Sequence, residues 1–185
     1  MIVIGITGTL GAGKGTIVDY LTREKGFLHF SVRDYLTLEI TRRGLPVNRD
    51  TMTQVANQLR ASNSPSFVTD QLLAEAEKTG KNCIIESIRT PGEVASLRRS
   101  SRFVLFAVDA HPDTRYQRIA LRGSATDQVS FDTFIANEQR EMASTDPNHQ
   151  NLSACIRQAD YTFTNNGSVD ELCQSVDRVL SGLEL

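Results

Sequence analysis

Short apolar runs alternate with amphipathic stretches along the whole chain. Two of the runs, Ile2–Thr7 and Phe103–Val108, are apolar at nearly every position, which is typical of parallel strands that are buried on both faces. Shorter runs predict three further strands: Phe27–Phe30, Asn82–Glu86 and Tyr161–Thr164. Because helical patterns separate these runs, we predict an α/β fold with a five-stranded parallel sheet and helices on both faces.

Caps and glycines mark where the helices begin and end. A helix over Lys14–Lys25 is closed by Gly26, and two capping boxes, Thr90–Glu93 and Ser168–Glu171, open later helices. The other predicted helices are Tyr35–Arg43, Asp50–Ala61, Ser66–Thr79, Pro112–Arg122, Ser130–Met142 and Pro147–Gln158. Since the chain has neither repeats nor linkers, residues 1–185 are predicted to form a single domain with excursions at about residues 31–79 and 123–150.

A glycine-rich loop joins the first strand to the first helix. Residues 8–16 read Gly-Thr-Leu-Gly-Ala-Gly-Lys-Gly-Thr, and the strand–loop–helix context indicates a P-loop, which binds a polyphosphorylated nucleotide. Glycines let the backbone approach an anion, and the N-terminus of the following helix attracts phosphate. Lys14 is predicted to reach the terminal phosphates. The predicted nucleotide-binding residues are Gly8, Thr9, Gly11, Ala12, Gly13, Lys14, Gly15 and Thr16.

The residue after Lys14 departs from the usual P-loop pattern. Gly15 stands where a serine or threonine commonly gives its hydroxyl to Mg²⁺, and Thr16 offers the nearest hydroxyl. We expect Thr16 either to help hold the metal or to bond a phosphate, in which case water and more distant acids carry the metal.

Two acids follow strands of the predicted sheet. Ligands of open α/β sheets bind at the carboxyl ends of the strands, and Asp34 and Glu86 come after the second and third strands. We expect both to lie near Lys14, one organising Mg²⁺ and one accepting or steering a proton, because phosphoryl transfer depends mainly on charge neutralisation and alignment. Asp34 has an alternative role as a helix N-cap, and Glu86 has a purely structural alternative.

Arginines follow the third and fourth strands. Arg89 is predicted to clamp a phosphate of the acceptor, its alternative being a surface residue beside a helix cap. Arg115, Arg118 and Arg122 share one face of a helix, and no acid is interleaved with them at helical spacing. They are therefore expected to face an anion such as the phosphates of ATP, and Arg140 to join them on closure of a lid. The alternative is a solvated basic face.

Composition excludes several classes of protein. The chain has 185 residues, of which 39% are hydrophobic and 23% charged, as in ordinary globular proteins. A net charge of −2 gives no indication of binding to nucleic acid or to a membrane surface. Three scattered cysteines, Cys83, Cys155 and Cys173, fit reduced thiols in the cytoplasm. The apolar N-terminal run is interpreted as a buried strand and not as a signal peptide.

Several segments resemble known kinases. Residues 11–16, Gly-Ala-Gly-Lys-Gly-Thr, are similar to the P-loop of adenylate kinases. Residues 30–36 resemble the Ser-Thr-Gly-Asp segment of that family, and residues 85–90 resemble its Leu-Asp-Gly-Phe-Pro-Arg-Thr segment with one residue fewer. Residues 159–168 are similar to the end of dephospho-CoA kinases. Over nearly its whole length, the chain resembles the nucleoside monophosphate kinase and dephospho-CoA kinase group of P-loop kinases.

This resemblance implies a three-layer P-loop NTPase fold, an acceptor site over residues 31–79, and a helical lid over residues 123–150. The family's phosphate-binding arginine after the Asp34 segment is replaced by Thr37, and Arg33 is the candidate to take over its role. The implied acceptor-binding residues are Ser31, Arg33, Asp34, Glu86 and Arg89. The implied catalytic residues are Lys14, Asp34, Arg118 and Arg122, and the implied metal-organising residues are Thr16, Asp34 and Glu86.

The favoured activity is phosphoryl transfer from ATP, with Mg²⁺, to a (deoxy)nucleoside monophosphate. One alternative is dephospho-CoA kinase, in which Asp34 would be the general base for a ribose hydroxyl. A second alternative is a nucleotide-binding switch or assembly ATPase that has no small-molecule acceptor. We expect a monomer or homodimer.

Overall fold

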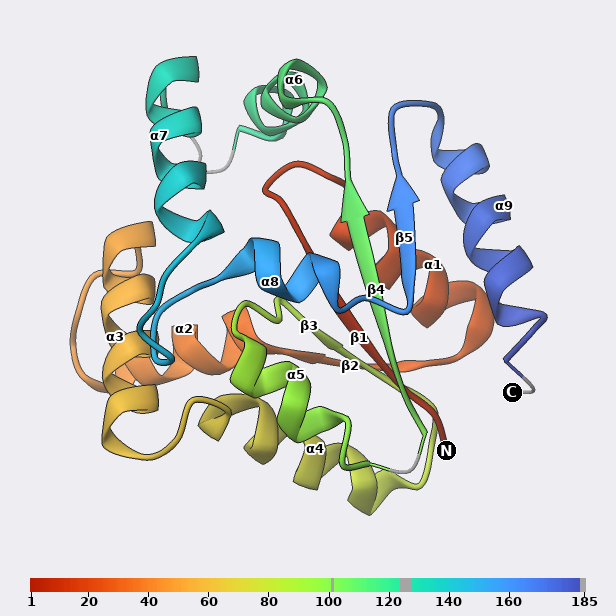
Figure 1. Cartoon of the computed structure of the whole chain (residues 1–185), viewed down its shortest axis with the longest axis horizontal. Coiled ribbons are helices and arrows are strands. Elements are labelled where there is room, and N and C mark those ends of the chain that lie inside the picture. Colours follow the sequence, from red (N-terminus) through yellow and green to blue (C-terminus); the bar gives the residue numbers. More distant parts are fainter. Residues whose placement is uncertain (101, 124–127, 184–185) are drawn as a thin grey trace.

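The computed structural model describes residues 1–100, 102–123 and 128–183, and within them the strands form one parallel sheet. The strand order is β2-β3-β1-β4-β5 (Figure 1). The strands are β1 Val3–Gly8, β2 Leu28–Ser31, β3 Cys83–Glu86, β4 Phe103–Asp109 and β5 Tyr161–Thr164. The prediction of a five-stranded parallel sheet is confirmed. Since β1 lies in the middle of the sheet, the loop that follows it lies at the centre of the carboxyl edge.

Helices cover both faces of this sheet. Their bounds are α1 Lys14–Lys25, α2 Val32–Arg42, α3 Arg49–Ser62, α4 Phe67–Thr79, α5 Pro91–Leu97, α6 Pro112–Arg122, α7 Phe131–Met142, α8 Leu152–Arg157 and α9 Val169–Leu180. Alternate residues of the central strands face two separate cores: Ile4 and Phe106 pack with α1 and α9, while Val3 and Leu105 pack with α2, α3, α4, α5 and α8. This two-sided burial explains the unbroken apolar runs of β1 and β4.

Two helices begin several residues away from the starts that the sequence pattern predicts. The predicted Tyr35–Arg43 helix begins at Val32, because the hydroxyl of Ser31 accepts a hydrogen bond from the N–H of Asp34 at 3.1 Å and acts as the N-cap. The predicted Pro147–Gln158 helix begins only at Leu152, where the side chain of Asn151 provides the cap. In both cases a side-chain cap, and not the apolar pattern, fixes the first turn.

Helices α6 and α7 lie beyond the carboxyl ends of the strands (Figure 1). The buried ring of Phe134 holds α7 against α6, through contacts with the ring of Tyr116 at 5.7 Å and with the guanidinium of Arg115 at 5.3 Å. Residues 124–127, at the start of the predicted lid, lie outside the described residues. Within the remainder of that excursion, α7 is packed over the edge of the sheet where the glycine loop lies. In the described ranges, no helix has the length and apolarity needed to span a membrane.

A buried ion pair fixes the chain between β3 and α5. Arg60 of α3 donates to Oε1 of Glu93 at 2.9 Å, and the two side chains are only 3% and 1% exposed. The other oxygen, Oε2, accepts from the N–H of Arg89 at 2.7 Å and from the N–H of Thr90 at 2.9 Å. One carboxylate therefore caps α5 and ties α3 to the segment that carries Arg89.

We expect Arg60→Ala to lower the free energy of unfolding by about 3–5 kcal/mol, because it leaves the Glu93 carboxylate buried without its counter-ion. Arg42→Ala is the control: it removes an arginine whose side chain is 78% exposed in its pair with Glu39, and we expect a change within about 0.5 kcal/mol. Urea unfolding of the three proteins measures both values. Equal stabilities for the two variants would contradict this account of Glu93.

Candidate functional site

Three glycines shape the loop after β1, and each is packed closely against a different neighbouring segment. Gly8, Gly11 and Gly13 all have positive φ, at 141°, 79° and 112°. A Cβ atom on Gly8 would lie 2.1 Å from the Val108 carbonyl oxygen, and one on Gly11 would lie 2.5 Å from that of Arg115. A Cβ atom on Gly13 would lie 2.3 Å from Nδ2 of Asn165. Glycine is therefore required at all three positions by conformation and by space.

The loop is also held by polar contacts from the neighbouring strands. Asn165, which follows β5 and is 7% exposed, donates from Nδ2 to the Ala12 carbonyl at 2.8 Å. The hydroxyl of Thr9 donates to the carboxylate of Asp109 at the end of β4. The sequence motif identified the loop, but it did not identify Asn165 or Asp109 as its supports, because both partners are more than ninety residues away in the chain.

Lys14 is the cation of the loop. Its ammonium donates to the carbonyl oxygens of Gly8 and Thr9, each at 2.8 Å. Burial and the positive charge of Arg89 lower the pKa of Lys14 from 10.5 to about 7, although the carboxylates of Glu86 and Glu141 partly oppose that shift. Charged side chains from β3, the β3–α5 connection and α7 thus act electrostatically on this lysine.

Glu86 lies at the end of β3, directly beside β1. Burial raises its pKa, but His29, Lys14 and Ser31 outweigh burial and lower it below the usual value, so the carboxylate is ionised at neutral pH. Oε1 lies 3.7 Å from Nε2 of His29 and accepts from the hydroxyl of Ser31 at 3.3 Å. Ser31, which the resemblance assigned to acceptor binding, therefore caps α2 and positions Glu86.

The next residue, Ser87, adopts a left-handed backbone with φ of 67°, an uncommon conformation for a residue other than glycine. The following residue, Ile88, is held over β1 by two hydrogen bonds. Its N–H donates to the Ile6 carbonyl at 3.2 Å, and its carbonyl accepts from the hydroxyl of Thr7 at 2.8 Å. The local conformation at Ser87 turns the chain from β3 toward Arg89.

Arg33 and Asp34 occupy the first turn of α2, at the carboxyl end of β2, and both are exposed. Asp34 is the third residue of that helix and not its N-cap, so the alternative capping role is excluded. The strongest charged influences on Lys14 come from Arg89, Glu86, Glu141 and Arg122. Direct action of Asp34 at the loop stays a prediction.

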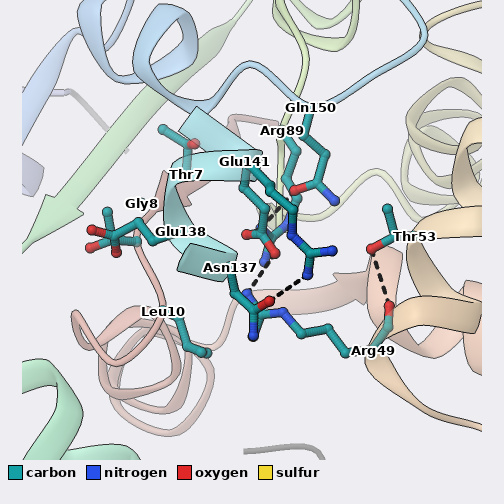
Figure 2. A network of polar contacts seen from close by, with 12 residues as sticks. Thr7, Gly8, Leu10, Arg49, Thr53, Arg89, Asn137, Glu138, Glu141 and Gln150 are labelled. Carbon is teal, nitrogen blue, oxygen red and sulfur yellow. Dashed lines mark hydrogen bonds and ion pairs between the residues drawn. The ribbon is translucent and has the colours of Figure 1, made fainter. Parts of the chain in front are cut away.

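Arg89 lies at the centre of a charged cluster (Figure 2). Its Nη1 atom donates to Oε2 of Glu141 at 2.5 Å and to Oε1 of Gln150 at 3.0 Å. Arg49, the first residue of α3, donates to the other oxygen of the same Glu141 carboxylate, also at 2.5 Å. Burial raises the pKa of Glu141, but Arg89 and Arg49 lower it below its ordinary value. Sequence reasoning missed Arg49, Glu141 and Gln150.

The arginines of α6 have separate roles. Arg115 is buried and pairs with both carboxylate oxygens of Glu138 on α7, so the anion that it faces is a carboxylate of the chain itself. The acid comes from another helix, which spacing within α6 does not reveal. Arg115 also donates to the Leu10 carbonyl of the loop at 3.3 Å. It therefore supports the loop and does not face a ligand.

Arg118, Arg122 and Arg140 each interact with a different part of the structure. Arg118 donates to the Asn165 carbonyl at 2.9 Å and so holds the segment that supports Gly13. The charge of Arg122, at the end of α6, helps to lower the pKa of Lys14, which places Arg122 within the electrostatic neighbourhood of the loop. Arg140 donates to Asn137 of its own helix. Only Arg122 of these three is linked to Lys14 by a described interaction.

Among the described residues, no group of three or more His, Cys, Asp or Glu side chains is arranged to hold a metal ion on its own. The Thr16 hydroxyl, which is half-buried at the start of α1, and the ionised Glu86 carboxylate are oxygen donors of the kind that Mg²⁺ prefers. Magnesium usually keeps several waters and also binds substrate phosphates. The residues present therefore fit a metal that enters with a nucleotide.

The order of the strands, the glycine loop after the central strand and the lysine at the start of α1 define a kinase-like P-loop NTPase. A family model described as an AAA domain matches residues 4–146. A UPF0200 protein of Pyrobaculum aerophilum is 30% identical over 181 residues, which cover 96% of each chain. One from Methanococcus vannielii is 29% identical over 97% of this chain and 95% of its own. The chain belongs to the UPF0200 family and carries this AAA domain.

Solved structures share the fold. Shikimate kinase from Bacteroides thetaiotaomicron aligns with a TM-score of 0.63 at 15% identity, over 97% of this chain and 98% of its own. The protein TT1252 from Thermus thermophilus aligns with a TM-score of 0.63 at 21% identity, over 98% and 97%. The predicted P-loop kinase fold is confirmed. These similarities do not distinguish a nucleoside monophosphate kinase from a dephospho-CoA kinase.

The geometry of the loop makes a matched pair of substitutions informative. We expect Gly13→Ala to destabilise the protein by about 2 kcal/mol or more, because the methyl group meets Asn165 and the backbone has positive φ. Gly15→Ala meets nothing within 4 Å and is expected to be neutral or to stabilise α1 by up to about 1 kcal/mol. Urea unfolding measures both, and a Gly13→Ala protein as stable as Gly15→Ala would contradict the packing described for the loop.

The lowered pKa of Lys14 predicts a pH dependence of stability. Between pH 7 and about 10 the unfolded chain keeps a proton on Lys14 that the folded protein releases, so folding becomes more favourable as the pH rises. Lys14→Met lacks this proton. The unfolding free energy of the wild type minus that of Lys14→Met should therefore be constant below about pH 6 and rise from pH 7 to 10. A difference that stays flat across this range would contradict the lowered pKa.

Proposed function

We propose that the protein is an ATP- and Mg²⁺-dependent kinase that transfers the terminal phosphoryl group of ATP to a small phosphorylated nucleotide, a (deoxy)nucleoside monophosphate. The observation that carries the proposal is the position of Arg89. It comes from the segment after β3, acts on Lys14 as its strongest charged neighbour, and contacts Glu141 on α7. An anion-binding arginine beside the P-loop lysine is what a second, phosphorylated substrate requires.

The roles follow from the placement of each group. The loop N–H groups and Lys14 hold the phosphates of ATP, and Arg122 adds positive charge from α6. Mg²⁺, when bound with ATP, neutralises phosphate charge, and Thr16 and Glu86 are the groups that would hold it, directly or through water. An oxygen of the acceptor attacks the γ-phosphorus as the bond to ADP breaks. Because the reaction must exclude water, α7 over the loop is suited to the role of a lid.

A second candidate activity is phosphorylation of a hydroxyl, as in dephospho-CoA kinases. It is favoured by Asp34, an exposed carboxylate at the carboxyl end of β2 for which the described part of the chain provides no side-chain hydrogen bond or ion pair. Such a carboxylate is available to accept a proton from a ribose hydroxyl. A monophosphate acceptor needs no such base, since its phosphate oxygen is already ionised at neutral pH.

The test is a panel of acceptors with Mg-ATP, in which ADP formation is measured with nucleoside monophosphates, with dephospho-CoA and with shikimate. We expect ADP to form with monophosphates, and Lys14→Met to lower kcat/KM at least about 100-fold. Lys81→Met, which removes an exposed lysine, is the control and is expected to match the wild type. ADP formation that no acceptor stimulates would overturn the kinase proposal, and stimulation by a protein partner alone would favour a switch or assembly ATPase.

A further inference from the structure

Two arginines from different segments hold one carboxylate beside the P-loop lysine. Arg49 contacts Oε1 of Glu141 and Arg89 contacts Oε2, each at 2.5 Å. The side chain of Arg49 is 22% exposed, that of Arg89 is 23% exposed, and that of Glu141 is 13% exposed. Guanidinium groups that take the two oxygens of one carboxylate form the arrangement that recognises carboxylates and phosphates in substrates. The chain itself thus provides the anion in an arginine site.

Helix stability does not account for this placement. Glu141 lies in the last turn of α7, where the negative end of the helix dipole disfavours a carboxylate, and Arg49 lies in the first turn of α3, where the positive end disfavours a cation. Each residue is therefore unfavourably located within its own helix, and it is the cluster around Arg89 that compensates.

The rest of α7 is anchored independently of Glu141. Phe134 is buried against α6, and Glu138 pairs with the buried Arg115. Both anchors precede Glu141 in the helix, Glu138 by three residues, and Glu141 lies one residue before the helix ends. Exchange of Glu141 for another anion would accordingly release only the end of α7 and leave the helix docked over the loop.

The site also lies on the acceptor side of Lys14. The Glu141 carboxylate raises the pKa of Lys14 and Arg89 lowers it, so both act on the ammonium that would contact the transferred phosphate. Gln150 accepts from Arg89 at 3.0 Å and fixes the guanidinium from the side of α8. An anion bound by Arg49 and Arg89 would thus be held near the reacting end of ATP.

We propose that Arg49 and Arg89 bind the anionic group of the acceptor, a phosphate or a carboxylate, and that Glu141 competes for the same two guanidinium groups and is displaced when the acceptor binds. This inference rests on the proposed function, because it assigns the substrate class to that acceptor site. It makes Glu141 a specificity-determining residue: neutral acceptors cannot replace a carboxylate that is held by two arginines, whereas anionic acceptors can.

The experiment uses inorganic phosphate as the probe, titrated calorimetrically in saturating Mg-ADP so that the loop already carries a nucleotide. We expect Glu141→Gln, which removes the competing charge, to bind phosphate about tenfold more tightly, and Arg49→Gln to bind it about tenfold more weakly. The double variant, Glu141→Gln with Arg49→Gln, should not show the tighter phosphate binding of Glu141→Gln. Asp132→Asn removes an exposed acid from the first turn of the same helix and should leave the affinity unchanged.

A parallel titration with acetate separates the two anion classes. A gain in Glu141→Gln for phosphate but not for acetate assigns a phosphate group to the acceptor, and the reverse assigns a carboxylate. Unchanged or weaker binding of both anions in Glu141→Gln would overturn the proposal, as would a gain that persists in the double variant. If Glu141→Gln does not fold, Glu141→Asp replaces it, because a shorter side chain cannot span both arginines; it too should bind the anion more tightly.

Measurement of acceptor-dependent ADP formation by the wild type keeps the two proposals distinguishable. If ADP forms with an acceptor but Glu141→Gln leaves anion binding and acceptor KM unchanged, the kinase proposal stands and this one fails. If Glu141→Gln binds phosphate more tightly but no acceptor stimulates ADP formation, the kinase proposal fails, and the assignment of the arginine site to a phosphoryl acceptor fails with it.

Discussion

The close packing of the glycine loop against three neighbouring segments is the constraint on which the rest of the site depends. Gly8 faces the backbone of β4, Gly11 faces the backbone of α6, and Gly13 faces the side chain of Asn165 after β5. No other residue type fits at these positions, so the loop cannot shift without moving an element behind it. The close packing of this loop therefore fixes the direction of Lys14, and with it the position of the ammonium relative to the charges around it.

The charges around Lys14 balance one another in a way that favours anionic ligands. Burial and Arg89 disfavour the ammonium, whereas Glu86 and Glu141 favour it. Glu86 is fixed at the end of β3 by Ser31 and His29. Glu141 is brought by a helix that follows the fourth strand. Burial and Arg89 outweigh the two carboxylates and lower the pKa of Lys14 to about 7, so phosphate charge brought by a nucleotide would favour the charged form.

The sequence predicted the parts of the fold that depend on local patterns. Apolar runs located β1 and β4, and the glycine spacing located the loop and Lys14, because a strand period and a tight turn are properties of neighbouring residues. The start of α8 was missed, because Asn151 caps the helix and it begins at Leu152 and not at Pro147. The partners of Arg115 and Arg49 were missed for a different reason: their carboxylates lie 23 and 92 residues away on α7, a separation that no spacing rule connects. An acid in the last turn of α7 was the one available signal for Glu141.

Helix α7 links the two sides of the site through glutamates three residues apart. Glu138 is tied by Arg115 to the Leu10 carbonyl of the loop, and Glu141 is tied to Arg89, which the buried carboxylate of Glu93 holds through its backbone N–H. The same helix is thus tied to the glycine loop, by way of Arg115, through one acid and to Arg49 and Arg89 through the other (Figure 2). The two ion pairs are separate, so Glu141 can lose its arginine partners without requiring Arg115 to leave its buried position. Under the proposed function, coupling between nucleotide and acceptor would therefore need only the end of α7 to move.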